Sequence, residues 1–257
     1  MVSSGTGTDR LRSYLVMAAT AGTIAFNFIA ATGRLGGGVD TGAISDKYPT
    51  VVTPAGYAFS IWTLIYVGLV AFSIYQLLPQ NLVKFRNVRL LYIISCVLNC
   101  TWLYFWQGEQ IVVCAVILLA LAVALFFINY QLQGHESTAE FWATKAPFGI
   151  YFGWVTAATL VNFAVTLVYQ RVQLSPSAWT TLGASLILVA ASLAVLIRLK
   201  LANFLYPLAI AWALTAIAVK QSGNTPIVVA CAAGVITSLI AALSFVVGLP
   251  STLSREQ

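Results

Sequence analysis

The sequence predicts an all-α, polytopic membrane helix bundle with about eight transmembrane helices. Of its 257 residues, 60% are hydrophobic and only 8% are charged, and the mean hydropathy is +0.90. A water-soluble domain needs more charge than this to cover its surface. The apolar stretches run for about 20 residues, the length that a helix needs to cross a bilayer. They are continuously apolar rather than alternating, which favours helices over a β-barrel.

Eight stretches are long and apolar enough to be membrane spans. The first follows Arg10 and Arg12, as a signal peptide would, but its apolar run continues through Asn27, past the roughly 7–15 residues of a signal core. We therefore expect it to remain in the mature protein. The second is opened by Pro54 and Gly56, which interrupt the preceding structure. The predicted spans are 13–32, 54–77, 89–107, 110–131, 145–169, 179–197, 202–219 and 226–248.

Basic residues set the expected orientation of the spans. With eight spans both termini lie on one side of the membrane, and nine basic residues fall on that side against four on the other. Because cytoplasmic loops carry the excess of lysine and arginine, both termini are predicted to be cytoplasmic. The net charge of +6 thus reflects topology, and no nucleic-acid partner is expected. The nine are Arg10, Arg12, Lys84, Arg86, Arg89, Lys145, Arg198, Lys200 and Arg255, and the four are Arg34, Lys47, Arg171 and Lys220.

The spans lack the side chains that ion-coupled transport and hydrolytic catalysis require. Ionisable residues inside a membrane usually mark ion pathways or proton relays, whereas the acidic residues here lie in loops or at span ends. The single histidine, His135, lies in a predicted loop, so it cannot complete a catalytic set or a metal site. No catalytic residue, metal ligand or obligatory cofactor is therefore predicted. The spans instead hold the amides of Asn27, Asn99, Asn129 and Asn162.

Two further features concern how the spans pack. Residues 33–53 form a glycine-rich loop too long for a tight connection, and such loops are usually functional lids or linkers. We expect this loop to close over a ligand site. Gly149 and Gly153 form a GxxxG pattern, which permits close approach of two helices. That contact is expected either within the bundle or between two copies of the chain.

Three predicted helices each gather aromatic rings and a polar group along one face. Residues three, four or seven apart share a helix face. Tryptophan N–H and asparagine amide groups are costly to leave unpaired in lipid, so these faces are expected to point inward. The three faces are Phe59, Trp62 and Tyr66; Asn99, Trp102 and Trp106; and Trp154, Ala158 and Asn162.

These faces have two interpretations. In the structural one, the asparagines hydrogen-bond between helices, and the rings fill the bundle or lie at the membrane interfaces. In the functional one, the faces line a cleft for a large flat apolar ligand with a few polar edges. All three faces share the same chemistry, and from the residues alone both interpretations stay open.

The spacing of these residues resembles that of the TspO/translocator protein family, also called tryptophan-rich sensory proteins. Pro54, Trp62 and Tyr66 are similar to the family's second-helix pattern, Pro-x7-Trp-x3-Tyr. Two further patterns, Asn-x2-Trp-x5-Gly of the third helix and Trp-x2-Phe-Ala-Thr-x2-Asn of the fifth, are similar to Asn99, Trp102 and Gly108 and to residues 154–162. The resemblance covers about residues 13–171.

The resemblance implies a five-helix transmembrane bundle over residues 1–174, followed by a C-terminal extension of three helices over residues 175–257. It also implies a pocket beneath the loop between the first two helices, for a large planar hydrophobic ligand such as a porphyrin, another tetrapyrrole or a sterol. A sensory or regulatory role would follow. The candidate ligand-binding residues are then Trp62, Tyr66, Asn99, Trp102, Trp154, Ala158 and Asn162.

Three other functions stay open at this point. The chain could transport small lipophilic compounds, it could degrade porphyrins under light, or it could be a structural subunit of a larger membrane complex. Its expected partners are membrane lipid and a hydrophobic small molecule, together with a second copy of the chain or that larger complex.

Overall fold

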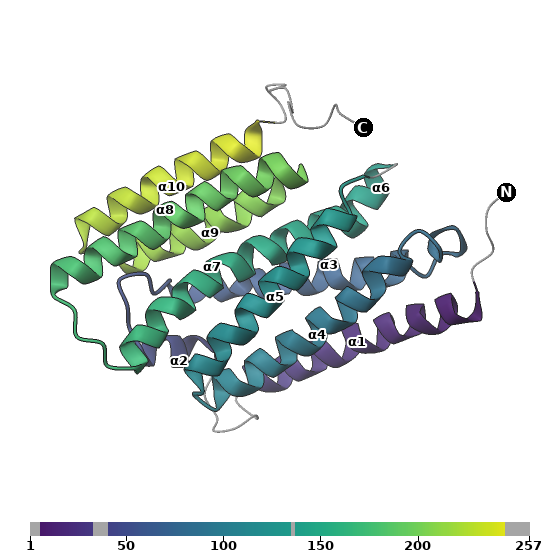
Figure 1. The fold of residues 1–257 in the computed structure, drawn as a ribbon, viewed down its shortest axis with the longest axis horizontal. Helices are drawn as coiled ribbons and strands as arrows, with labels where there is room; N and C mark the ends of the chain where they lie inside the picture. Colours follow the sequence, from purple (N-terminus) through teal and green to yellow (C-terminus); the bar gives the residue numbers. More distant parts are fainter. Residues whose placement is uncertain (1–5, 33–40, 135–136, 245–257) are drawn as a thin grey trace. The chain divides into compact units, whose positions relative to one another are not determined.

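The computed structural model describes residues 6–32, 41–134 and 137–244, which form helices joined by turns, with no strand among them (Figure 1). Within these described ranges, seven helices are long and apolar enough to cross a membrane. The chain is therefore an all-α, polytopic integral membrane protein, as its composition predicts. The seven are α1 (Gly7–Ala31), α3 with the 3₁₀ turn before it (Gly56–Tyr75), α4 (Arg86–Gln107), α5 (Ile111–Gln131), α7 with α6 and a π-helical turn before it (Thr138–Tyr169), α8 (Pro176–Leu201) and α10 (Thr225–Leu243).

The seventh predicted span, 202–219, is a shorter helix, α9 (Leu205–Lys220). Its 16 residues extend about 24 Å at 1.5 Å per residue, less than the roughly 30 Å of the hydrocarbon core. The helix starts late because Ala202 ends α8 in the left-handed region (φ 50°), and Asn203 Oδ1 then accepts a hydrogen bond from the N–H of Leu205 at 3.1 Å. Most residues of α9 are buried, and the helix packs against α8 and α10. A helix shielded in this way does not have to match the bilayer on its own.

The chain forms two compact units. Unit 1 comprises Met1–Lys47 and Ser60–Phe148, and unit 2 comprises Tyr48–Phe59 and Gly149–Gln257. The last division between them, after Phe148, falls inside α7, whose regular part is Ala146–Tyr169. The domain boundary expected between residues 174 and 175 stays a prediction.

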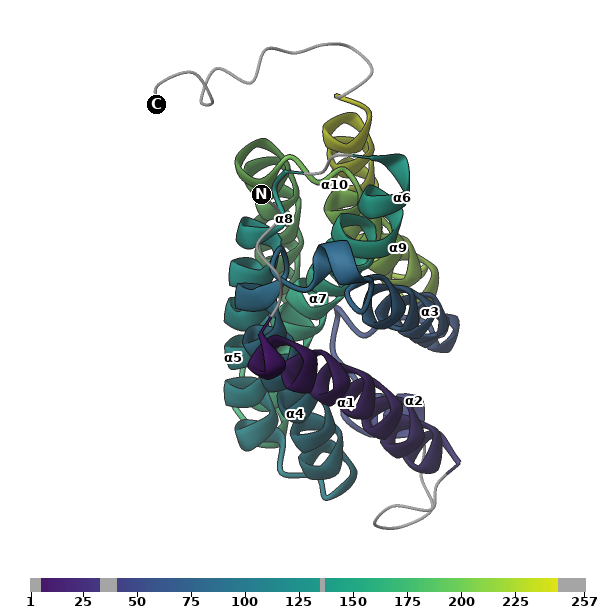
Figure 2. The same ribbon diagram turned by 90° about the vertical axis from the view of Figure 1, so that its right-hand side faces the viewer.

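Polar side chains join the helices of unit 1, in which α1 packs along α4 and α4 along α5 (Figure 2). Near the start of α1, the Asp9 carboxylate accepts two hydrogen bonds from Arg86 of α4, from Nε at 2.7 Å and from Nη2 at 2.6 Å. Halfway along α1, the Thr20 hydroxyl hydrogen-bonds with Ser73 of α3 and Tyr92 of α4. Such bonds hold helices together where lipid removes the hydrophobic drive to associate.

Arg89 is fully buried in the first turn of α4, although the sequence alone places it among the basic residues at the membrane surface. Its Nε donates to Gln76 Oε1 at 2.7 Å, and its Nη1 donates to the Leu82 carbonyl at 2.6 Å. Its Nη2 lies 3.3 Å from the Gln76 carbonyl and 3.4 Å from the Asn81 carbonyl. The guanidinium therefore satisfies the carbonyls of Gln76 and Leu82 at the end of α3 and in the following turn, whereas the Asn81 carbonyl also accepts a hydrogen bond from the N–H of Phe85 at 3.2 Å.

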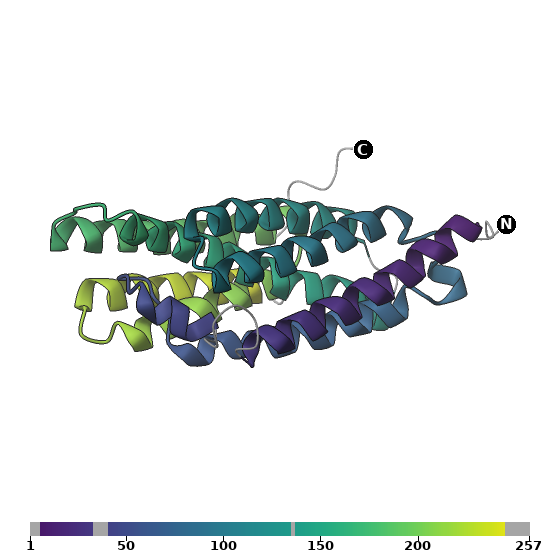
Figure 3. The same ribbon diagram turned by 90° about the horizontal axis from the view of Figure 1, so that it is seen from below.

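In unit 2, α9 lies beside both α8 and α10 (Figure 1 and Figure 3). Glycines set how closely α7 approaches the start of α9, because Gly149 faces Asn203 and Gly153 faces Tyr206. A Cβ atom at Gly153 would lie 2.5 Å from the Tyr206 carbonyl oxygen. The GxxxG pattern is expected from the sequence to make a close contact either within the bundle or between two copies of the chain. In the structure it makes one within the chain, between α7 and the start of α9.

The segment Tyr48–Phe59 belongs to unit 2 and is hydrogen-bonded to α9 and to the residue that follows it. Trp212 Nε1 of α9 donates to the Ala58 carbonyl at 3.0 Å. Gln221 Nε2, just beyond α9, donates to the Thr50 carbonyl at 3.0 Å. The end of this segment is a 3₁₀ turn rather than the first turn of an α-helix.

The loop predicted over residues 33–53 is structured where it is described. Residues 33–40 lie outside the described residues. Thr41–Lys47 form a short helix, α2, and the carbonyl of Thr41 accepts a hydrogen bond from Trp106 Nε1 at 3.2 Å. Closure of this loop over a ligand site stays a prediction.

Candidate ligand site

Four rings from α3 and α4 stack in unit 1. Trp62 and Tyr66 lie one turn apart on α3, with ring centroids 5.6 Å apart and planes inclined by 19°. Trp102 and Trp106 lie one turn apart on α4, at 5.9 Å and 28°. Trp62 connects the two pairs, since its centroid is 6.2 Å from that of Trp102, at 26°. Four-residue spacing places each pair on one helix face, and helix packing then aligns the two faces.

An amide network from three helices lies next to these rings. Asn27 Nδ2 of α1 donates to Asn99 Oδ1 of α4 at 2.8 Å and to the Thr23 carbonyl at 2.9 Å. The Tyr66 hydroxyl of α3 donates to Asn27 Oδ1. Both hydrogen-bonding groups of the Asn27 amide are therefore used within unit 1. The interhelical asparagine bonds of the structural interpretation are present at this position.

Two buried donors in the same place have no hydrogen-bond partner among the described residues. They are Asn99 Nδ2 and Trp102 Nε1. Asn99 is 0% and Trp102 5% exposed, and the two residues lie three positions apart on α4, so the donors share a face. Leaving a buried donor unpaired costs about 1–3 kcal/mol. An acceptor atom of a bound ligand or a water molecule would remove this cost.

The cluster of Trp62, Tyr66, Asn99 and Trp102, with Asn27 added, is what we call the ring–amide cluster. It presents flat apolar surface, no formally charged side chain and two unpaired donors. Trp62 and Tyr66 are only half-buried, so their rings are partly accessible. Such a surface suits an uncharged or hydrophobic body that carries hydrogen-bond acceptors on its edge.

A second set of candidate residues lies along α7 in unit 2. Trp154 is 4% exposed and packs edge-to-face against Phe59, with ring centroids 5.9 Å apart and planes at 83°. Asn162 is buried, and its Oδ1 has no hydrogen-bond partner within the described part of the chain. Ala158, between them on the same face, is half-buried. This face offers one ring, one small residue and one unpaired acceptor.

The expected second-helix face of Phe59, Trp62 and Tyr66 is divided between the two units. Phe59 lies in the 3₁₀ turn Gly56–Ser60 and pairs with Trp154 in unit 2, whereas Trp62 and Tyr66 stack in unit 1. The division between the units falls between residues 59 and 60, inside this turn, so Phe59 and Trp62 belong to different units.

The structure thus brings four of the seven candidate ligand-binding residues together in unit 1 and places the other three along α7 in unit 2. A role in ligand binding stays a prediction for all seven. Asn27 was absent from the candidates although it contacts two of them, Tyr66 and Asn99. The sequence does show that Asn27 places an amide inside the first span. Its hydrogen-bond partners, however, become known only from the way the helices pack.

A family model described as TSPO-like protein matches residues 13–246. The matched range extends from the first helix into the residues that follow α10, well beyond residue 171, where the resemblance seen in the sequence ends. Neither the comparison with curated proteins nor that with solved structures gives a match.

Proposed function

The chain belongs to the TSPO-like protein family, and from that premise we propose that it binds a large planar hydrophobic ligand in a sensory or regulatory role. The ligand is a porphyrin or other tetrapyrrole, or a sterol-like molecule, and the site is the ring–amide cluster. The observation that carries this function is the pair of unpaired buried donors, Asn99 Nδ2 and Trp102 Nε1, beside the half-buried rings of Trp62 and Tyr66.

Each part of the cluster has a distinct task in this function. The faces of Trp62 and Tyr66 supply apolar area and ring stacking, which together dominate the affinity for a flat apolar body. The donors on Asn99 and Trp102 meet acceptor atoms on the ligand edge and fix its orientation. Asn27 holds Asn99 and Tyr66 in place through its two hydrogen bonds.

The face on α7 in unit 2 offers related chemistry. Trp154 is a buried ring and Asn162 provides an unpaired acceptor. A donor on the ligand, such as a hydroxyl or a pyrrole N–H, would suit Asn162 Oδ1. Substitutions at these two residues therefore test the α7 face separately from the ring–amide cluster.

Substitution of Trp62 by leucine is expected to weaken protoporphyrin binding about tenfold, because stacking and apolar contact with the ring are lost. Substitution of Trp102 by phenylalanine keeps a ring but removes the Nε1 donor, so a loss of about three- to tenfold is expected. Both are measured by titrating the detergent-purified chain with protoporphyrin and following the absorbance of the ligand.

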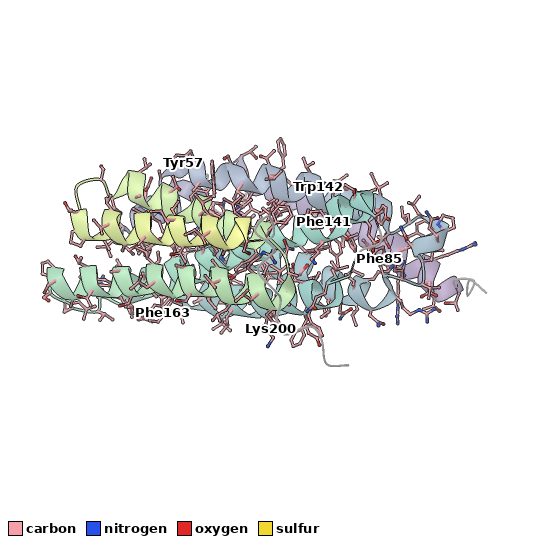
Figure 4. The ribbon with its side chains drawn as sticks, turned by 90° about the horizontal axis from the view of Figure 1, so that it is seen from above. Tyr57, Phe85, Phe141, Trp142, Phe163 and Lys200 are labelled. Carbon is pink, nitrogen blue, oxygen red and sulfur yellow. The ribbon has the colours of Figure 1, made fainter. Side chains whose placement is uncertain are left out.

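Trp142 provides the matched control for these substitutions. Its side chain is 56% exposed and lies outside the ring–amide cluster (Figure 4). Trp142→Leu should leave the affinity for protoporphyrin unchanged. An affinity that is unaltered in Trp62→Leu as well, or equally reduced in Trp142→Leu, would contradict the assignment of the site.

Both termini are proposed to face the cytoplasm. The excess of basic residues on that side supports this orientation. The short connections on either side of α9 force α8, α9 and α10 to alternate in direction. This alternation supports an even number of membrane crossings, with both termini on one side. A reporter that fluoresces only in the cytoplasm is expected to be active when it is fused to either terminus. Activity at one terminus alone would indicate an odd number of crossings, in which α9 does not span.

A further inference from the structure

Unit 2 contains an open pocket where the segment Tyr48–Phe59 meets the ends of its helices. Its volume is about 880 Å³, and ligand sites for small molecules span roughly 300–1,000 Å³. None of its lining residues belongs to the candidate ligand site described above. The lining residues are Pro49, Thr50, Val51, Val168, Arg171, Val172, Gln173, Pro176, Trp179, Thr180, Lys220, Gln221 and Asn224.

The charge of this pocket is positive. Arg171 and Lys220 are its two charged lining residues, and no acidic residue lines it. The described residues of unit 2, 48–59 and 149–244, contain no aspartate or glutamate. The guanidinium of Arg171 is exposed and makes no hydrogen bond or ion pair with any residue that the structure describes. Its five N–H donors are therefore available to a ligand.

Helix ends fix the positions of these polar groups. Arg171 follows α7 with φ 56°, and its N–H donates to the Val168 carbonyl at 2.9 Å, which closes the helix end. Lys220 is the last residue of α9. Asn224 caps α10 by accepting a hydrogen bond from the N–H of Ile227 at 3.4 Å. Charge in the pocket thus comes from short, defined turns rather than from a long loop.

The pocket also has an apolar side. Val168 lies in the last turn of α7, Val172 follows that helix, and Trp179 lies in the first turn of α8. Since these helices are long enough to cross a membrane, their ends lie near the level of the lipid headgroups, where tryptophan is enriched. A molecule bound here would meet cations at one end and apolar surface at the other.

We propose that this cationic pocket binds the phosphate group of an anionic membrane lipid, with the lipid chains along Val168, Val172 and Trp179. The planar fork of an arginine matches a phosphate group in two parallel hydrogen bonds. Inorganic phosphate in solution would offer Arg171 the same phosphate group without the lipid chains. The test therefore has to distinguish a bound lipid from bound inorganic phosphate.

The test uses the full chain in neutral detergent, incubated with phosphatidylglycerol or with phosphatidylcholine, and native mass spectrometry counts the retained lipid. The unaltered chain is expected to retain phosphatidylglycerol in preference to phosphatidylcholine. The double variant Arg171→Gln, Lys220→Gln should retain it about tenfold less well, because charge-assisted hydrogen bonds are lost. Arg171 is exposed and its guanidinium has no partner among the described residues, so Arg171→Gln alone should retain less phosphatidylglycerol and unfold at the same temperature as the unaltered chain.

A second double variant, Arg12→Gln, Lys200→Gln, removes the same charge outside the pocket. Both residues are exposed, and Lys200 points away from the helices (Figure 4). This control should retain phosphatidylglycerol like the unaltered chain. An equal loss in the two double variants, or equal retention of the two lipids by the unaltered chain, would overturn the proposal.

Competition with inorganic phosphate distinguishes a lipid headgroup from free phosphate as the ligand of the pocket. At equal ionic strength, excess inorganic phosphate is expected to reduce the retention of phosphatidylglycerol only weakly, because it lacks the chain contacts. If instead inorganic phosphate raises the unfolding temperature through Arg171 and Lys220 while phosphatidylglycerol is not preferred, the lipid assignment is wrong and the pocket binds a soluble phosphate.

Discussion

Substitution of Arg89 by alanine is expected to lower the free energy of unfolding by about 3–5 kcal/mol. The Arg89 side chain is 0% exposed and donates at 2.7 Å to Gln76 Oε1 and at 2.6 Å to the Leu82 carbonyl. Alanine removes these charged donors and leaves the acceptors buried without a partner. Each such acceptor costs about 1–3 kcal/mol, and a cavity is added to that cost.

Arg12 is the matched control for Arg89. It carries the same charge but lies exposed on α1, so Arg12→Ala should change the free energy of unfolding by no more than about 0.5 kcal/mol. Arg89→Lys should recover only part of the loss, because an ammonium cannot reproduce the planar fork. Thermal unfolding of the detergent-purified variants measures both. A variant Arg89→Ala as stable as Arg12→Ala would show that the buried hydrogen bonds contribute nothing.

Arg89 also shows what hydropathy can and cannot predict. The sequence places it at the edge of a span, where basic residues usually meet lipid headgroups. Its burial depends on the chain after α3, where the turn Pro79–Asn81 lies close enough for the Leu82 and Asn81 carbonyls to meet the guanidinium. No local pattern encodes that arrangement, because it is created by packing between segments.

The positions of most spans are predictable because a membrane helix is specified by its own composition. The predicted span 110–131 agrees with α5 (Ile111–Gln131) to within one residue. The span predicted from residue 179 begins earlier, at Pro176, because Ser175 caps α8 and proline occupies its first position. Mean hydropathy carries no information about capping residues, so it cannot predict this earlier start. The helix α9 is shorter than the bilayer is thick, which the composition of its own residues does not predict. It can be short because the neighbouring helices α8 and α10 bury it.

The candidate site is predictable within a helix but not between helices. Four-residue spacing predicts that Trp62 and Tyr66 share a face, and their rings do stack. Phe59, three residues before Trp62, instead packs against Trp154 of α7, a contact that the spacing does not reveal. The hydrogen-bond partners of Asn27 come from two other helices, α3 and α4. The sequence therefore predicts that an amide lies inside the first span, but not which side chains it contacts.

Substitution of Gly153 by alanine is expected to lower the free energy of unfolding by about 2–3 kcal/mol. The new Cβ atom would lie 2.5 Å from the Tyr206 carbonyl oxygen and 2.8 Å from the Cβ of Ala209. A backbone carbonyl cannot rotate away as a side chain can. The methyl group therefore has to push α7 and α9 apart, which opens gaps along the rest of their contact.

Gly22 of α1 is the control for this substitution, because an added Cβ there meets nothing within 4 Å. Gly22→Ala should stabilise by up to about 1 kcal/mol, since alanine is the better helix former. The double variant Gly153→Ala, Ala209→Gly removes one of the two clashes and should recover part of the loss. If Gly153→Ala unfolded at the same temperature as Gly22→Ala, the close contact of α7 with α9 would be absent from the folded protein. A loss in Gly153→Ala that Ala209→Gly partly reverses would instead place the GxxxG pattern inside the chain rather than between two copies of it.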